Sequence, residues 1–259
     1  MTEQNHWVRP QERPFVRRVE DAMNQVSTSH TWYITDFLTP REQVLISSIV
    51  HSRGLTVAYS GGYDGSERQR ALIMPDNWYP QSEDFAIVAL SVVPFDGQVA
   101  FSHGEVMGSV LGTGIDRKVV GDIVIAKAQV YIFVKREMSN HLIDTLSHVG
   151  RSTVEVRQAA IVEGIEPPSY EVNRISVASL RLDAVIAASC HISRDAAQTK
   201  VSKGQVKLNF IETDKPDESV AVGDLVSVHG FGRVEITNFI GESKKSRQLL
   251  EVHVMKSKH

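Results

Sequence analysis

A short basic run stands out in a chain whose formal net charge is −3. The run SRDAAQTKVSKGQVKLN, residues 193–209, contains one acid, Asp195, and four cations: Arg194, Lys200, Lys203 and Lys207. Guanidinium and ammonium groups bind phosphate oxygens through charge and through directional hydrogen bonds. A concentrated basic patch therefore predicts binding of a phosphate polymer, and the alternative is an ordinary solvated helix face.

Two short helices and a strand must position these cations. Leu182, Val185 and Ile186 share one face of the first helix, and Ser193 is the expected cap of the second. The inner face of the second helix consists of Ala196, Ala197 and Val201. Gly204 then allows a sharp exit into the strand QVKLN. Because apolar residues do the packing, we expect stability to be nearly unchanged when Arg194, Lys200 and Lys203 are replaced together by alanine.

Four motifs follow one another in residues 179–234: R-L-D-x-x-I-A, S-R-D-A-A, K-G-Q-V-x-L-N and V-x-x-G-D-x-V-S-V. In order and spacing they resemble the alpha-L RNA-binding domain, which is named after the fourth protein of the small ribosomal subunit. The matching positions are Arg181, Leu182, Asp183, Ser193, Arg194, Lys203, Gly204, Val206, Asn209, Gly223 and Asp224. The resemblance implies that one face grips structured RNA through its phosphates. The residues implied in that contact are Arg181, Ser193, Arg194, Lys200, Lys203 and Lys207, whereas Asn209 would fix the turn.

The upstream sequence predicts two further regions in an α+β fold. Residues 1–80 contain an amphipathic helix from about Phe15 to Val26, and a second helix that is capped by Thr39 and begins at Pro40. The strands LTVAY and RALIM follow, joined by the loop SGGYDGSERQ.

Residues 81–165 have the element order βαββαβ, which is the ferredoxin-like split motif. Its elements are the strand DFAIVALSVV, a short helix near 103–111, strands near 122–126 and 129–134, a helix near 137–149 and the strand STVEVRQA. The linker EGIEPPSYE, residues 163–171, separates this region from residues 172–259, which we expect to open with the two short helices and to end in a bent sheet.

Three upstream segments, FLTPREQ, GGYDGSERQRALIMP and LGTGIDRKVVGDI, complete a wider pattern. Together with the C-terminal domain they resemble bacterial YlmH-type RNA-binding proteins over nearly the whole chain. The resemblance implies an N-terminal helical and hairpin region, a ferredoxin-like domain and a C-terminal alpha-L domain. It also implies a gene among cell-division genes, and action on large ribosomal subunits blocked by peptidyl-tRNA. The implied partners are ribosomal RNA, tRNA and the large ribosomal subunit.

Secondary RNA or ribosome contacts are also suggested by cations in loops. These candidates are Arg68 and Arg70 at the hairpin loop, and Arg117 and Lys118 after LGTGID. Tyr131 and Phe133 alternate on the third strand of the βαββαβ region, where RNA-recognition domains display stacking aromatics. The surrounding KAQVYIFVK lacks the glycines of that signature, so core packing is the favoured interpretation.

We expect no catalytic centre, metal or cofactor. The pair His103 and Glu105 matches half of a zinc-deaminase pattern, but the chain has one cysteine, Cys190, and the pattern needs two. Cys190 lies among small residues and is expected in the core. Asp183 sits in a run that resembles the catalytic segment of pseudouridine synthases, yet it opens a helix of the RNA-binding domain, where an acid favours the helix dipole.

Composition is that of a globular protein without a membrane span: 42% of residues are hydrophobic and 23% are charged. The N-terminal run lacks the apolar core of a signal peptide, and we expect a cytoplasmic monomer. Our interpretation is a non-catalytic RNA-binding protein in translation quality control. Two alternatives stay open: a pseudouridine-synthase-like RNA-modifying enzyme, and a scaffold associated with cell division. Loss of one modified nucleoside in deletion cells would favour the enzyme, and co-purification with division proteins after nuclease treatment would favour the scaffold.

Overall fold

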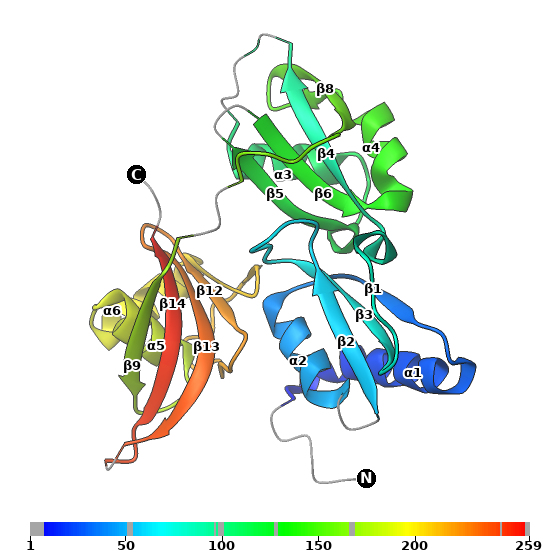
Figure 1. Ribbon diagram of the computed structural model, residues 1–259. Coiled ribbons are helices and arrows are strands. Elements are labelled where there is room, and N and C mark those ends of the chain that lie inside the picture. Colours follow the sequence, from blue (N-terminus) through cyan, green and yellow to red (C-terminus); the bar gives the residue numbers. More distant parts are fainter. Residues whose placement is uncertain are drawn as a thin grey trace. The chain divides into compact units, whose positions relative to one another are not determined.

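The computed structural model describes residues 8–50, 54–95, 97, 101–126, 129–165, 169–243 and 245–256 (Figure 1). They form two compact units. One contains the described residues of 1–13, 40–45 and 168–259, and the other contains those of 14–39 and 46–167. The division falls inside the predicted linker, whose residues 166–168 lie outside the described residues. Most of the predicted regions 1–80 and 81–165 thus shares one unit.

The N-terminal part of the fold packs helices against an antiparallel sheet with the strand order β1-β3-β2. Its elements are α1 (Arg13–Ser29), β1 (Tyr33–Leu38), α2 (Pro40–Val50), β2 (Leu55–Ser60) and β3 (Gln69–Pro75). Val19 and Met23 of α1 join Ile46 and Val50 of α2 in one core, because the apolar residues recur at helical spacing. Both predicted helices and the predicted hairpin are confirmed.

Strand β1 was not predicted from the sequence. It pairs with β3, but the register shifts between Ile34 and Phe37, which marks a bulge. A bulge breaks the regular alternation of buried and exposed side chains by which a strand is recognised. The burial of β1 is accordingly irregular, since Phe37 and Leu38 are both buried.

The middle part of the fold contains the predicted βαββαβ order. Its elements are β4 (Ile87–Pro94), α3 (His103–Gly112), β5 (Val120–Ala126), β6 (Gln129–Lys135), α4 (Ser139–Thr145), β7 (His148–Val149) and β8 (Ser152–Gln158). The sheet order is β5-β6-β4-β8-β7, so the first and third strands of the motif are central. Val106 and Val110 of α3 and Leu142 of α4 share a core with the strands.

Helix α4 is shorter than the predicted helix near 137–149. It ends at Thr145, and His148 and Val149 instead form β7, which pairs with the start of β8. Gly150 has φ +58°, a left-handed conformation that lets the chain reverse between these two strands. The apolar Leu146 and Val149 are buried by this turn and not by a longer helix.

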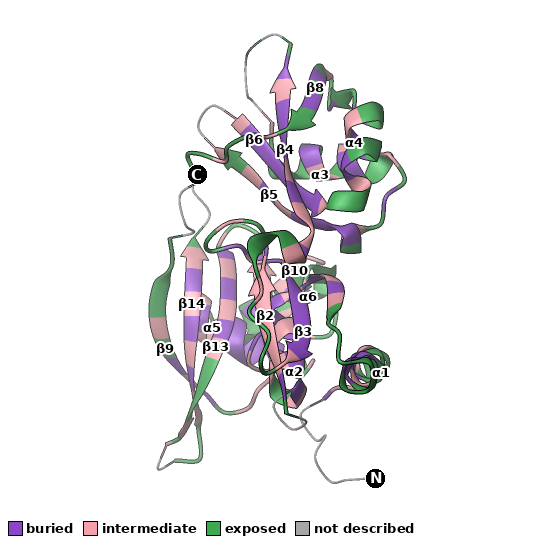
Figure 2. Ribbon diagram, turned by 45° about the vertical axis from the view of Figure 1, so that its right-hand side comes forward, coloured by how far each residue is buried: buried purple, intermediate pink, exposed green. Residues whose placement is uncertain are grey.

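The C-terminal part of the fold is a six-stranded sheet with two short helices packed on it (Figure 1). Its elements are β9 (Glu171–Val177), α5 (Leu182–Cys190), α6 (Arg194–Ser202), β10 (Val206–Leu208), β11 (Ile211–Glu212), β12 (Leu225–Val228), β13 (Gly232–Glu242) and β14 (Gln248–Lys256). The strand order is β11-β10-β12-β13-β14-β9. Figure 2 shows the alternating burial along β14 that is typical of a sheet with one face on the core.

The predicted region 172–259 opens with a strand, β9, and not with a helix. β9 lies at the edge of the sheet and pairs only with β14 among the described strands. Its first half is mostly exposed, and only Ile175 and Val177 are buried. An edge strand with so little buried surface leaves a weak pattern in the sequence. The two helices that follow are confirmed, as is the burial of Ala197 and Val201, but Ala196, which was predicted on the same inner face, is exposed.

Candidate nucleic-acid interface

Two of the predicted RNA-binding arginines meet on one buried carboxylate. Asp183 has no exposed side-chain surface, whereas the side chains of Arg181 and Arg194 are 37% and 46% exposed. Arg181 donates from Nε and Nη2 to the two carboxylate oxygens at 3.2 and 3.1 Å. Arg194 donates from Nε and Nη2 at 3.1 and 3.2 Å, and Gln198 adds a hydrogen bond of 2.8 Å. The carboxylate therefore holds two guanidinium groups side by side at the surface. We call these four residues the Asp183 cluster.

Two helix starts bring the Asp183 cluster together. Arg181 occupies the N-cap position of α5, so Asp183 falls in the first turn, where the helix dipole favours a negative charge. Ser193 caps α6 as predicted, because its hydroxyl accepts a hydrogen bond of 3.1 Å from the Ala196 amide. Arg194 and Gln198 follow at a spacing of one helical turn and face α5 together.

The charge of Asp183 is retained despite its burial. Burial by itself raises the pKa of a carboxyl group, but the hydrogen bonds from Arg181, Arg194 and Gln198 outweigh it and hold the pKa of Asp183 below the ordinary aspartate value. Asp183 is thus an ionised structural partner of the two arginines.

The three predicted lysines lie farther along the chain. Lys200, near the end of α6, donates from Nζ to the His229 carbonyl at 3.3 Å. Lys203 is the C-cap residue of α6 and is exposed. Lys203 follows Arg194 by nine positions, and a helix rises about 13 Å over nine residues. Lys207 is exposed on β10 between the buried Val206 and Leu208, so it faces away from the helices.

The turn implied for Asn209 is present, with partners that the sequence did not suggest. Asn209 donates from Nδ2 to the buried Asp224 carboxylate at 2.9 Å, and its Oδ1 accepts from the Leu225 amide at 3.0 Å. Within the same compact unit Arg9 also pairs with Asp224, and Arg41 donates to the Val222 carbonyl at 3.1 Å. Arg9 and Arg41 lie far from these partners in the sequence. Arg41 belongs to the segment FLTPREQ, but nothing in that segment indicated its partner.

Arg68 and Arg70 do not form part of the candidate interface. Only 6% and 4% of their surfaces are exposed. Arg68 donates to the Phe37 carbonyl at 2.9 Å, and Arg70 donates to the carbonyls of Thr35 and Phe85 at 2.8 and 2.7 Å. Both guanidinium groups therefore satisfy buried main-chain oxygens around β1 and β3. The suggestion that they contact RNA is replaced by this structural role.

Arg117 and Lys118 differ from one another. Arg117 is partly buried and donates to the main-chain oxygens of Val120 and Gly121, and burial together with the neighbouring Arg68 lowers the pKa of Arg117 to about 10. Lys118 is 59% exposed and pairs at 3.4 Å with the equally exposed Asp116. Of these four loop cations, Lys118 alone has a highly exposed side chain. Its ion pair with Asp116 is also exposed, and solvent weakens such pairs.

Tyr131 and Phe133 are buried, as the sequence analysis favoured. Only 3% and 1% of their surfaces are exposed. The Phe133 ring lies 4.7 Å from the ring of Tyr63, and the Tyr131 hydroxyl accepts from the Glu163 amide at 3.3 Å. The chain's own hairpin loop and the segment near Glu163 thus cover the strand face on which RNA-recognition domains display aromatics.

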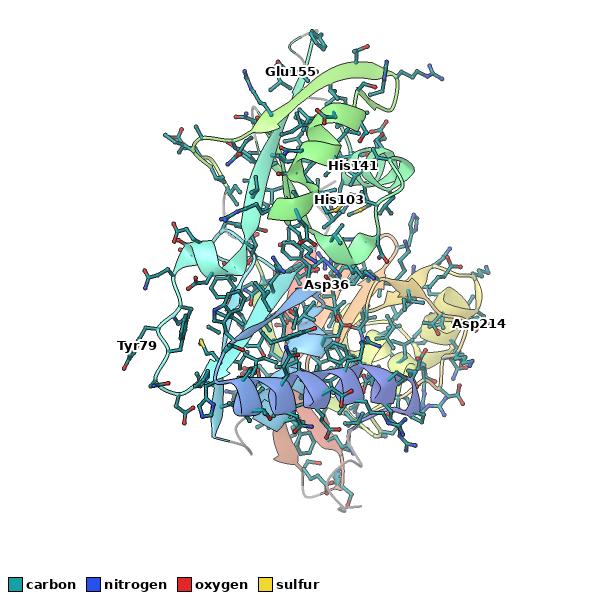
Figure 3. The ribbon with its side chains drawn as sticks, turned by 90° about the vertical axis from the view of Figure 1, so that its right-hand side faces the viewer. Asp36, Tyr79, His103, His141, Glu155 and Asp214 are labelled. Atoms are coloured by element: carbon teal, nitrogen blue, oxygen red, sulfur yellow. The ribbon has the colours of Figure 1, made fainter. Side chains whose placement is uncertain are left out.

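No metal or thiol site was found in the described part of the chain. It holds no group of three or more His, Cys, Asp or Glu that could bind a metal ion. His103 at the start of α3 and His141 of α4 are labelled in Figure 3, and His141 contacts the Thr113 carbonyl at 3.2 Å. Burial raises the pKa of the Cys190 thiol to about 11, which leaves it protonated at neutral pH.

Among the described helices, none has both the length and the apolar character needed to cross a membrane.

The chain has an α+β fold, and comparisons with known proteins place it in a class of RNA-binding proteins. Residues 11–78 match the model "YlmH, N-terminal", and residues 80–163 match "Putative RNA-binding domain in YlmH". The chain belongs to the YlmH family.

Two relatives illustrate the range of the family. The chain is 34% identical over 240 residues to "Ribosome-associated protein quality control protein P2" of Bacillus subtilis (strain 168). The aligned region covers 92% of this chain and 93% of that protein. A solved structure, "Cell division protein ylmH from Streptococcus pneumoniae", aligns with a TM-score of 0.51 and 26% identity over 58% of this chain and 92% of that one.

Proposed function

We propose that this protein is a non-catalytic RNA-binding factor that acts on ribosomal RNA and tRNA of large ribosomal subunits blocked by peptidyl-tRNA. The Asp183 cluster is the observation that carries the proposal. The name of the Bacillus subtilis relative supports a role in ribosome-associated quality control, and the resemblance to the alpha-L domain supports the C-terminal region as the part that binds RNA.

The Asp183 cluster has the geometry of a phosphate receptor. Each guanidinium uses two nitrogens, Nε and Nη2, to bind Asp183, and its remaining N–H donors are available to a ligand. Because Asp183 fixes the side chains, less rotamer freedom is lost when a phosphate binds. Two arginines on one acid also leave the cluster with a net positive charge, so it attracts an anion.

The burial of Asp183 supports a binding factor over a modifying enzyme. A catalytic aspartate must reach its target base, whereas the side chain of Asp183 has no exposed surface and both its oxygens accept hydrogen bonds from arginine. The division-associated scaffold finds support in the name of the Streptococcus pneumoniae relative alone.

The salt dependence of RNA binding tests the proposal. Every cation that neutralises a phosphate releases counterions, so affinity for tRNA should fall as salt rises. With ~3–5 contacts, a plot of log affinity against log salt should have a slope of roughly −2 to −4. Fluorescence anisotropy with labelled tRNA over a range of KCl concentrations measures this slope. A salt-insensitive affinity would remove the phosphate contacts from the proposal.

A further inference from the structure

The turn between β10 and β11 contains an aromatic residue in an unfavourable backbone conformation. Leu208 pairs with Ile211, so the loop consists of Asn209 and Phe210 alone. Their φ angles are +49° and +71°, and positive φ at both loop residues is the pattern of a type I′ turn. Such turns favour Asn followed by Gly. Asn209 fits this preference, whereas Phe210 places a large side chain where glycine is favoured.

Packing in the hydrophobic core does not explain the unfavourable backbone conformation of Phe210. Phe210 is 37% exposed and its neighbour Ile211 is 73% exposed, and neither belongs to the hydrophobic core of the C-terminal unit. The turn itself is held by the hydrogen bonds of Asn209 with Asp224 and Leu225, which do not require an aromatic ring. Strained residues outside a protein's core are concentrated at functional sites.

The Phe210 ring lies next to a cation. The Arg233 guanidinium lies 5.8 Å from the ring centroid, within cation–π distance. Lys207 pairs with Glu212 on one side and with Ser227 on the other, and Ser227 pairs in turn with Arg233. The four side chains therefore form a row on the sheet face away from α5 and α6, with two cations and one acid. The ring thus lies beside Arg233, in the turn that follows the strand carrying Lys207.

We infer that Phe210 is a stacking platform for an unpaired RNA base. An aromatic ring offers a flat apolar surface to a nucleobase, and neighbouring cations bind the phosphates on either side of that base. The row of Lys207, Ser227 and Arg233 supplies those cations. An unpaired base is the expected ligand because a base inside a duplex has both of its faces covered. This inference rests on the proposed RNA-binding function and adds a base-binding subsite to it.

The test compares two RNAs and two matched variants of the full chain. The RNAs are unmodified tRNA, which has unpaired loop bases, and a blunt RNA duplex, which has none. The variants are Phe210→Tyr, which keeps the aromatic ring, and Phe210→Leu, which keeps an apolar side chain but removes the ring. Both substitutions retain a Cβ at φ +71°, so the backbone strain is the same in the two variants. Thermal melts of both variants confirm folding.

Stacking on an aromatic side chain typically changes affinity by about tenfold or more. Phe210→Leu should therefore bind tRNA about tenfold more weakly than the unmodified chain, and Phe210→Tyr should bind it equally well, while neither affects duplex binding. An unchanged tRNA affinity of Phe210→Leu would overturn the inference. Equal losses in both variants on both RNAs would also overturn it, because the ring would then act through packing. If the unmodified chain binds neither RNA, the proposed function itself fails and the subsite with it.

Discussion

Replacing Lys200, Lys203 and Lys207 together by alanine is expected to weaken ribosome association about 100-fold, with little change in melting temperature. About 1 kcal/mol for each of the three lost lysine contacts, the usual net value of a hydrogen bond in water, gives a factor of this size. Stability should be nearly unchanged, because Lys203 and Lys207 are exposed and Lys200 contacts one carbonyl at 3.3 Å. Co-sedimentation with purified ribosomes, together with a thermal melt, measures both effects.

A second triple variant controls for net charge. Three exposed cations of the same unit lie toward the other edge of the sheet from β10: Arg174 in β9, Lys245 before β14 and Lys256 at the end of β14. Their replacement by alanine removes the same formal charge, and we expect it to weaken association much less. Equal losses in the two variants would mean that ribosome association depends on overall charge and not on Lys200, Lys203 and Lys207.

Replacing both Arg181 and Arg194 by alanine is expected to lower the free energy of unfolding by about 3 kcal/mol. This value is at the lower end for breaking a buried ion pair, because both arginines are partly exposed and water replaces part of their contribution. The loss arises because Asp183 would stay buried while it loses the hydrogen bonds from both arginines. Of the three side chains that donate to it in the described structure, only Gln198 would remain. Adding Asp183→Asn removes the buried charge and should recover a large part of the stability. Urea unfolding of the three proteins measures these differences.

The pH dependence of this destabilisation has a definite sign. In the unmodified chain the pKa of Asp183 lies below the ordinary value of about 3.9, so its contribution to stability is present above that pH and is lost as the pH falls. Without the arginines, burial raises the pKa, and stability is then lost as the pH rises. The double variant should therefore be closer to the unmodified chain at about pH 5 than at about pH 7. The same destabilisation at both pH values would contradict this account of the cluster.

The pairing of Asp183 with Arg194 also changes an expectation from the sequence. The spacing of Ala197 and Val201 correctly predicted which face of α6 is buried, because helical periodicity is a local property. The same periodicity suggested that Arg194 could be removed at no cost. The partner of Arg194 is on another helix, eleven residues away, and pairing between elements leaves no periodic signal. Arg194 is therefore needed for stability as well as for the candidate interface.

Other parts of the fold were less predictable for the same physical reason. The burial of Arg70 depends on the carbonyls of Thr35 and Phe85, which the sheet brings together from distant positions. The bulged strand β1 and the edge strand β9 lack the alternation that identifies a strand in a sequence. Elements with strong periodicity, such as α1 and the βαββαβ order, were predicted correctly. The sequence thus suggested candidate site residues by their type, but it could not indicate their partners in the fold.

The most direct test of the central claim is a crosslinking map of RNA on the full chain. Cells that produce the protein are irradiated with ultraviolet light, and the crosslinked peptides are identified by mass spectrometry. We expect crosslinks to large-subunit ribosomal RNA or tRNA in peptides that span Arg181 to Glu212, which contain the Asp183 cluster and the three lysines. Crosslinks confined to residues 80–163, the segment that matches the RNA-binding family model, would contradict the claim that the Asp183 cluster and the three lysines bind the RNA.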